Sequence, residues 1–198
     1  MSANIYPIFD TILGKPEKEK LLNQKGIVIW LIGLSGSGKS TLARALENQL
    51  YKEGHFTQLL DGDNMRTGIN KNLEFSDEDR VENLRRTAEV AKLFANSGVI
   101  TICSFITPTK ASRTQIKNIL KDLYFEVFVE CPLEECERRD VKGIYAKARK
   151  GEIKNFTGID APFEDPVNPN LVLQTHLHDL EKCLEKLRNS IQDRIKLD

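Results

Sequence analysis

The sequence has no net charge and no long apolar run. The 29 Lys and Arg residues balance 29 Asp and Glu residues, so the chain lacks the strongly basic surface of many nucleic-acid-binding domains. No stretch of 18 consecutive apolar residues occurs, and we therefore expect no transmembrane helix and no membrane partner. A basic segment followed by an apolar core is also missing from the first residues, so we expect no signal peptide and a cytoplasmic location.

Closely spaced metal-binding residues are missing as well. The four cysteines form no C-x-x-C motif, and the three histidines show no spacing typical of metal ligands. We expect free thiols that fill the core, and we predict no histidine metal site. A length of 198 residues suits one α/β domain that buries most of its surface.

What the chain does have is a glycine-rich motif that fits the phosphate-binding loop G-x-x-x-x-G-K-[S/T]. An apolar run at 27–32 precedes the motif, and a helix-forming stretch at 41–50 follows it. Between a buried strand and a helix N-terminus, backbone N–H groups close around phosphate oxygens. We expect Lys39 to reach the β- and γ-phosphates of ATP and Ser40 to ligate Mg²⁺. The residues expected to bind ATP are Gly33, Leu34, Ser35, Gly36, Ser37, Gly38, Lys39, Ser40 and Thr41.

Strand-like and helix-like segments alternate along the chain, which predicts an α/β fold with a mostly parallel, five-stranded sheet. We expect a three-layer α/β/α domain of the P-loop NTPase type over 26–198, preceded by an N-terminal arm over 1–25. A basic segment at about 139–166 is predicted to be a mobile lid over a phosphate-rich site. The strands are predicted at 27–32, 56–60, 99–103, 124–130 and 170–173, and the helices at 39–53, 77–97, 110–121, 133–138 and 178–195.

A pair of aspartates follows the second predicted strand. Asp61 and Asp63 are two residues apart and are expected at the carboxyl end of the sheet, where ligands bind in open α/β folds. One carboxylate would hold Mg²⁺, and the other would orient or deprotonate an attacking hydroxyl. Arg66 would grip the anionic end of the acceptor.

With these motifs the chain resembles the adenylylsulfate kinases, which transfer the γ-phosphate of ATP to the 3′-hydroxyl of adenosine 5′-phosphosulfate (APS) and so produce 3′-phosphoadenosine 5′-phosphosulfate (PAPS). The resemblance covers about residues 26–175. Besides the glycine-rich loop, three segments carry it: Asp61–Arg66, Phe75–Arg86 and the unusual Lys147–Asp160.

The resemblance implies a set of site residues. Lys39, Asp61, Asp63 and Thr107 would be catalytic, Ser40 and Asp61 would hold Mg²⁺, and Arg139 would pack on the donor adenine. Phe75 and Phe156 would sandwich the acceptor adenine. Family members usually carry a serine, often listed as phosphorylated, where this chain has Thr107, and we favour direct transfer between the nucleotides. The residues implied for the acceptor site are Asp63, Asn64, Met65, Arg66, Phe75, Arg80, Asn83, Ile106, Thr107, Lys142, Lys147, Asn155 and Phe156.

Two other functions fit part of the pattern. One is a P-loop kinase of another nucleotide 5′-conjugate, such as a cytidine diphosphate derivative. The other is a non-catalytic nucleotide-binding module in a sulfate-activation complex, which the presence of Lys39, Ser40, Asp61 and Asp63 disfavours. The resemblance also implies a homodimer, and an ATP sulfurylase is a candidate partner.

Overall fold

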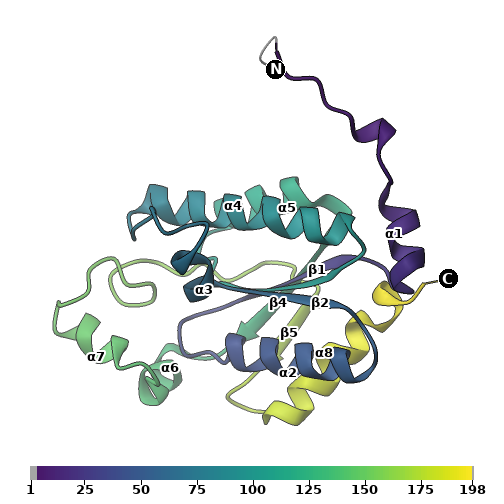
Figure 1. Cartoon of the computed structure of the whole chain (residues 1–198). Helices are drawn as coiled ribbons and strands as arrows, with labels where there is room; N and C mark the ends of the chain where they lie inside the picture. Colours follow the sequence, from purple (N-terminus) through teal and green to yellow (C-terminus); the bar gives the residue numbers. More distant parts are fainter. Residues whose placement is uncertain (1–3, 198) are drawn as a thin grey trace.

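A single parallel sheet forms the centre of the protein (Figure 1). The computed structural model describes residues 4–197. Its strands pair in the order β2-β3-β1-β4-β5, and every pairing is parallel. The predicted α/β fold is confirmed, and the sheet is parallel throughout. The strands are β1 (Ile27–Ile32), β2 (Thr57–Asp61), β3 (Ile100–Ser104), β4 (Tyr124–Glu130) and β5 (Leu171–Gln174).

Helices cover both faces of the sheet, which gives the three layers visible in Figure 1. Helices α2 and α8 lie on one face, and α4 and α5 lie on the other. The helices are α1 (Lys15–Leu22), α2 (Lys39–Lys52), α3 (Gly62–Thr67), α4 (Asp77–Asn96), α5 (Lys110–Leu120), α6 (Leu133–Arg139), α7 (Ile144–Arg149) and α8 (Leu180–Ile195), with 3-10 turns at Phe9–Thr11 and Lys121–Leu123.

The central strand β1 explains why the apolar run at 27–32 is continuous rather than alternating. Every residue of β1 is buried, because parallel strands in such folds are covered on both faces. Ile29 and Leu31 belong to the core beneath α2 and α8. Val28 and Trp30 belong to the core beneath α4 and α5. All five strands point their carboxyl ends toward the side of the molecule that carries α3, α6 and α7 (Figure 1).

The five predicted strands and five predicted helices are present, with ends that differ from the prediction by at most two residues. Three short helices were not predicted. Helices α3 and α7 have six residues each, and so few residues give no readable 3.6-residue period. Helix α1 lies within the segment expected to be an arm.

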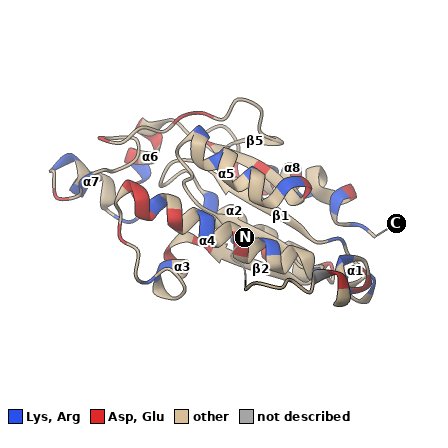
Figure 2. Ribbon diagram, turned by 90° about the horizontal axis from the view of Figure 1, so that it is seen from above, with Lys and Arg blue, Asp and Glu red and all other residues tan. Residues whose placement is uncertain are grey.

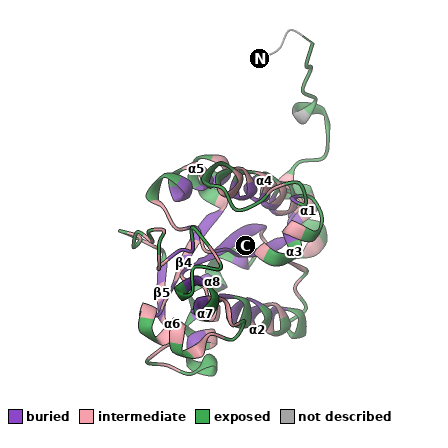
Figure 3. Cartoon of the chain, turned by 90° about the vertical axis from the view of Figure 1, so that its left-hand side faces the viewer, coloured by how far each residue is buried: buried purple, intermediate pink, exposed green. Residues whose placement is uncertain are grey.

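The N-terminal segment divides into an exposed part and a docked part. Before α1, the chain runs away from the body of the molecule (Figures 1 and 3), and Ile5, Tyr6 and Ile8 are largely exposed. Helix α1 itself is anchored by Glu19, whose carboxylate accepts a hydrogen bond of 2.7 Å from the Gly26 backbone N–H. No helix among residues 4–197 is long and apolar enough to cross a membrane.

Candidate active site

The glycine-rich loop connects β1 to α2 in the conformation that the motif predicts. Gly33, Gly36 and Gly38 all have positive φ angles, which other residues adopt only with strain. At Gly33 an added Cβ would lie 2.5 Å from the carbonyl oxygen of Val129, so no side chain fits there. Gly38 directly precedes α2, and the loop therefore presents its backbone at a helix N-terminus.

Two residues that the sequence analysis missed hold this loop from outside. The Tyr145 hydroxyl, on α7 of the lid, donates a 2.9 Å hydrogen bond to the carbonyl oxygen of Ser35. The Thr175 hydroxyl, just after β5, donates a 2.7 Å hydrogen bond to the carbonyl oxygen of Ser37. An aromatic residue inside a charged segment was the available signal for Tyr145, whereas nothing in the sequence distinguishes Thr175 from other loop threonines.

Arg139 lies beside the loop, as expected for a donor-site residue. Its guanidinium donates a 2.8 Å hydrogen bond to the Thr175 carbonyl oxygen and another of 2.8 Å to the Glu135 carboxylate. The planar guanidinium is thereby fixed next to Gly36, with 3.5 Å between Nη1 and the Gly36 carbonyl oxygen.

The side chain of Lys39 is folded back onto the loop. It is only 8% exposed, and Nζ donates a 2.7 Å hydrogen bond to the Leu34 carbonyl oxygen. Burial lowers the pKa of Lys39 from 10.5 to about 8, and nearby Asp61 and Asp63 offset only part of that effect. The pocket thus holds a cation that a bound phosphate would stabilise.

This lowered pKa predicts a pH-dependent affinity for ATP. Phosphate binds the charged amine, so above pH 8 the empty protein must take up a proton to bind ATP. We expect the Kd for ATP to rise from pH 8 to pH 9, by at most about tenfold per pH unit. Calorimetric titrations of the protein with ATP across this range measure the effect. A profile that is equally steep in Lys39→Met would contradict the assignment to Lys39.

Hydroxyl and carboxylate oxygens from three segments converge at the start of α2. Ser40 Oγ donates a 2.8 Å hydrogen bond to Asp61 Oδ2 and lies 3.2 Å from Ser104 Oγ. Ser40 lies in the first turn of α2, Asp61 is the last residue of β2, and Ser104 is the last residue of β3. Oxygen donors of this kind fit Mg²⁺, which prefers carboxylate and hydroxyl ligands beside phosphates. The residues predicted to hold the metal are therefore brought together.

Asp63 lies at the same carboxyl edge of the sheet, on the side exposed to solvent. Its backbone N–H donates to Asp61 Oδ1, which caps α3 and sets the two carboxylates in a fixed order. The Asp63 carboxylate is largely exposed and forms an ion pair with Lys142 of the lid. The segment predicted to be a lid and the aspartate turn thus meet across the predicted site.

Arg66 and Arg80 shape the predicted acceptor side. The Arg66 guanidinium lies 4.4 Å from the centre of the exposed Phe75 ring, a cation–π contact. Arg80 donates to the Phe75 carbonyl oxygen, at 3.0 Å, and across to Asn155 and Thr157 of the lid. Phe75 and the 155–157 segment are therefore neighbours, as the predicted adenine site requires.

Other predicted acceptor residues are more buried than expected. Phe156 is 9% exposed, and its ring packs edge-on against Tyr145 at 4.9 Å between centroids. Met65 lies in the core beneath α4. Asn83 is 5% exposed, and its side-chain oxygen accepts a 2.8 Å hydrogen bond from Asn70. The aromatic sandwich therefore stays a prediction that requires the lid segment to shift.

The remaining predicted residues lie around the same edge. Ile106 and Thr107 follow β3, and Ile106 accepts a hydrogen bond of 3.2 Å from the Gly33 N–H. Thr107 is 1% exposed, and its hydroxyl accepts a 3.0 Å hydrogen bond from Trp30 Nε1. Asn64 on α3 and Lys147 on α7 are exposed, and basic residues mark the lid around α7 in Figure 2.

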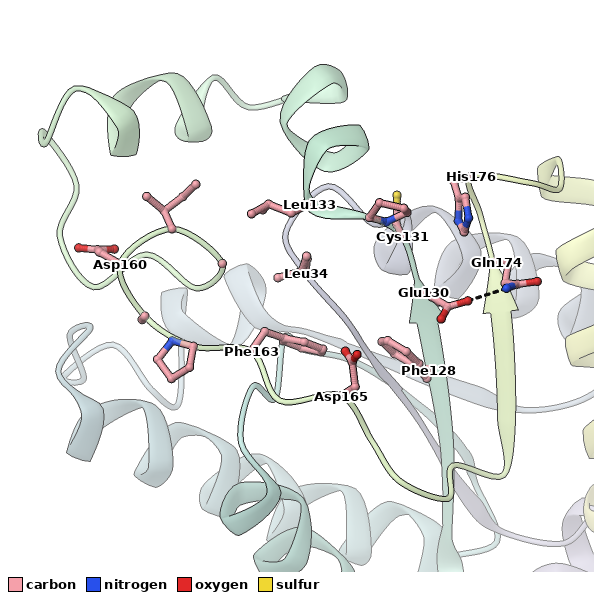
Figure 4. A pocket seen from close by; sticks show the side chains of 15 residues that line it. Leu34, Phe128, Glu130, Cys131, Leu133, Asp160, Phe163, Asp165, Gln174 and His176 are labelled. Carbon is pink, nitrogen blue, oxygen red and sulfur yellow. Dashed lines mark hydrogen bonds between the residues drawn. The ribbon is translucent and has the colours of Figure 1, made fainter.

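A cavity of about 780 Å³ shares Leu34 with the glycine-rich loop, but its lining includes neither Lys39 nor the two aspartates of the turn (Figure 4). Leu34 and Leu133 point into it from the glycine-rich loop and α6, and Phe163 stacks on Phe128 at 6.0 Å between ring centroids. Its lining includes three carboxylates and no Lys or Arg, which disfavours phosphate groups. The glycine-rich loop and the aspartate turn, rather than this cavity, therefore form the candidate active site.

The parallel sheet, the glycine-rich loop and the aspartates at its carboxyl edge define a P-loop kinase. The family model for adenylylsulphate kinase matches residues 25–174. The chain belongs to the adenylylsulfate kinase family, the enzymes that phosphorylate APS to PAPS, and the activity expected from the sequence is confirmed.

Individual relatives agree with the family match. An adenylyl-sulfate kinase of Bacteroides fragilis (strain YCH46) is 56% identical over 193 residues, which is 97% of this chain and 96% of the relative. One from Bacteroides thetaiotaomicron is 57% identical over 194 residues, covering 98% and 96%. Among solved structures, the Mycobacterium tuberculosis APS kinase in complex with AMPPNP and APS is 43% identical, with a TM-score of 0.82, over 85% of this chain and 98% of that one.

Proposed function

We propose that this protein transfers the γ-phosphate of ATP directly to the 3′-hydroxyl of APS at the carboxyl edge of its sheet. The observation that carries the proposal is the 2.8 Å hydrogen bond between Ser40 and Asp61. It joins the phosphate-binding loop to the aspartate turn, so a donor triphosphate and an acceptor hydroxyl can meet there. The relative from Mycobacterium tuberculosis was solved with AMPPNP and APS together, which supports the same pair of ligands here.

The donor half of the site would use the loop, Lys39 and Arg139. Backbone N–H groups of the loop bind the phosphates, and Lys39 offsets charge on the β–γ bridge. Arg139, fixed beside Gly36, packs on the donor adenine. Ser40 and Asp61 would hold Mg²⁺, which neutralises charge on the β- and γ-phosphates when bound.

The acceptor half would use the aspartate turn and α4. Arg66 and Arg80 hold the phosphosulfate by charge-assisted hydrogen bonds, and Asp63 orients the 3′-hydroxyl toward the γ-phosphorus and accepts its proton. Lys142 leaves Asp63 as the acceptor enters, because both compete for the same carboxylate. Most of the rate acceleration then comes from positioning and electrostatics.

The burial of Thr107 favours direct transfer over a phosphorylated intermediate. Its hydroxyl is shielded from solvent and engaged by Trp30. A phosphorylated Thr107 would need to break that hydrogen bond and hold a dianionic group in a buried position.

Product identification tests the proposed function. We expect the protein with Mg-ATP and APS to yield ADP and PAPS in equal amounts, and to yield no ADP above background with a cytidine diphosphate derivative as acceptor. Chromatography with mass detection identifies the products. Tight ATP binding without PAPS formation would instead support a non-catalytic nucleotide-binding module.

Substitution of Phe75 tests the acceptor adenine site. Phe75→Ala is expected to weaken APS binding by roughly 1–3 kcal/mol, the scale of base–aromatic stacking, without changing the affinity for ATP. Calorimetric titration with each nucleotide measures both values. The matched control is Phe56→Ala. Phe56 is also largely exposed, but it precedes the first residue of β2 and so lies at the end of this strand away from Asp61. Equal APS affinities for the wild type and Phe75→Ala would remove Phe75 from the site.

We also propose that the protein is a homodimer, as the sequence analysis expected. The exposed apolar residues of the segment before α1 support this proposal, because burying them against a second copy would remove them from water. Sedimentation equilibrium should give twice the chain mass of 22.5 kDa. A monomeric mass at micromolar concentration would refute it.

A further inference from the structure

A buried arginine lies behind the loop that follows β3. Arg113, on α5, is only 6% exposed. Its guanidinium donates a 3.0 Å hydrogen bond to the carbonyl oxygen of Thr107 and a 2.6 Å hydrogen bond to the carbonyl oxygen of Glu164. Burying a guanidinium is costly unless its donors are satisfied. Arg113 therefore binds together two backbone segments that are 57 residues apart in the sequence and does not face the solvent.

The backbone that Arg113 holds at Thr107 is strained. Thr107 has a φ of +49°, in the left-handed region that is unusual for a β-branched residue. Such a conformation persists only where its surroundings fix it. Here Arg113 binds the carbonyl oxygen of Thr107, Trp30 binds its hydroxyl, and the Gly33 N–H binds the preceding carbonyl oxygen of Ile106.

The second carbonyl oxygen that Arg113 binds, that of Glu164, lies near the end of the lid segment, where the chain returns toward the sheet. The Glu164 N–H donates a 2.9 Å hydrogen bond to the Pro108 carbonyl oxygen. The Glu164 carboxylate accepts a hydrogen bond from the Lys110 N–H at the start of α5. With Arg113, these contacts join the end of the lid segment, the loop at 105–108 and the first turns of α5 into one unit.

We propose that Arg113 is a positioning residue for the acceptor nucleotide. It holds Ile106 and Thr107 in a strained shape beside the glycine-rich loop and ties that shape to the lid through Glu164. This inference rests on the proposed function, because it assumes that APS binds against the loop at 105–108. Arg113 acts through the backbone of this loop and does not itself touch the substrate.

ATP and APS are bound through different contacts. ATP is bound by the glycine-rich loop, whose shape is fixed by its own glycines and by Tyr145 and Thr175. The loop at 105–108 is held by Arg113 and Trp30, and its bond to the glycine-rich loop, from the Gly33 N–H to Ile106, does not involve Arg113. Loss of the Arg113 hydrogen bonds should therefore weaken APS binding and leave ATP binding unchanged.

The test compares Arg113→Met, Arg113→Lys and the control Lys117→Met, which removes an exposed charge from the same helix. We expect Arg113→Met to raise the KM for APS by about 10- to 100-fold, because it removes two hydrogen bonds donated by a charged group. The KM for ATP should stay within about twofold. Lysine can reach only one of the two carbonyl oxygens, so Arg113→Lys should give a smaller increase. Lys117→Met should match the wild type.

Trp30 provides a second readout that does not depend on turnover. It is the single tryptophan of the chain, and its indole N–H binds Thr107 directly. Titration of APS without ATP should change the Trp30 emission, and the resulting Kd should be higher in Arg113→Met than in the wild type. Near-ultraviolet circular dichroism and the melting temperature of each variant show whether it is folded.

The outcomes separate this inference from the proposed function. If the wild type forms no PAPS, the proposed function fails and the inference fails with it. If the wild type forms PAPS but folded Arg113→Met or Arg113→Lys keeps the wild-type KM and Kd for APS, the inference alone fails. Equal losses of APS and ATP affinity would also overturn it, because they indicate a general structural role. If Arg113→Met does not fold, Arg113→Lys carries the same test.

Discussion

Replacing Lys39 with methionine is expected to lower kcat by at least about 10²-fold, the effect of removing one donor that stabilises transition-state charge. Methionine preserves most of the side-chain volume but not the charge. Lys39 is the buried cation of the glycine-rich loop, and in the proposed reaction its charge acts beside the β–γ bridge. Steady-state rates of PAPS formation at saturating ATP and APS measure the loss.

The same substitution should stabilise the empty protein. The pKa of Lys39 is lowered from 10.5 to about 8, chiefly by burial, so the fold disfavours the charged amine and this cost is fully present below pH 8. It amounts to up to about 3 kcal/mol at pH 7 and disappears as the pH rises toward 10.5. Lys39→Met removes the cost but leaves the Leu34 carbonyl oxygen without its donor, so the net gain is smaller.

Thermal melting without nucleotide at pH 7 and pH 9.5 measures this effect, with a larger increase expected at pH 7. Lys52→Met, at the exposed end of the same helix, is the matched control and should change neither kcat nor stability appreciably. A Lys39→Met protein that keeps more than a tenth of the wild-type kcat, or that melts below the wild type, would contradict this account of the loop.

Replacing Asp63 with asparagine is expected to lower kcat by about 10²- to 10⁴-fold, the usual contribution of a positioned acid–base group. Asparagine keeps the shape of the side chain but cannot accept the proton of the 3′-hydroxyl. The fold of α3 should survive, because Asp61 rather than Asp63 caps this helix. ATP affinity should stay unchanged, since Asp63 lies outside the glycine-rich loop.

Lys142→Met distinguishes the effect of the Asp63 carboxylate itself from the effect of its ion pair with the lid. This variant breaks the contact with Asp63 but leaves the carboxylate in place, so its kcat should fall far less than that of Asp63→Asn. Rates at saturating concentrations of both nucleotides give the comparison. Equal losses in the two variants would assign the effect to the contact between the lid and the turn rather than to proton transfer.

The sequence predicts the parts of the site that depend on regular structure. Ser40 follows the loop after β1, and Asp61 ends β2. In a parallel sheet both strand ends lie at one edge, so their meeting at 2.8 Å follows from the strand pattern and the motif. The continuous apolar run at 27–32 likewise indicates that β1 is central, and each of its residues is buried.

The contacts that hold the site in place depend on tertiary packing and were not predictable in this way. Phe156 matches an adenine-binding pattern, yet its ring is buried against Tyr145 because the lid segment packs onto Cys131 and Cys136 in a small apolar cluster. The strained backbone of Thr107 is held by a tryptophan 77 residues earlier and an arginine on the next helix. Neither partner can be inferred from local spacing.

The central claim is that donor and acceptor meet at this sheet edge and that the phosphoryl group passes directly between them. The stereochemical course of transfer from ATP with a chiral, isotopically labelled γ-phosphate to APS tests it most directly. A single in-line displacement predicts inversion of configuration at phosphorus in the PAPS formed. Retention would show two displacements through a phosphorylated protein group and would contradict the account.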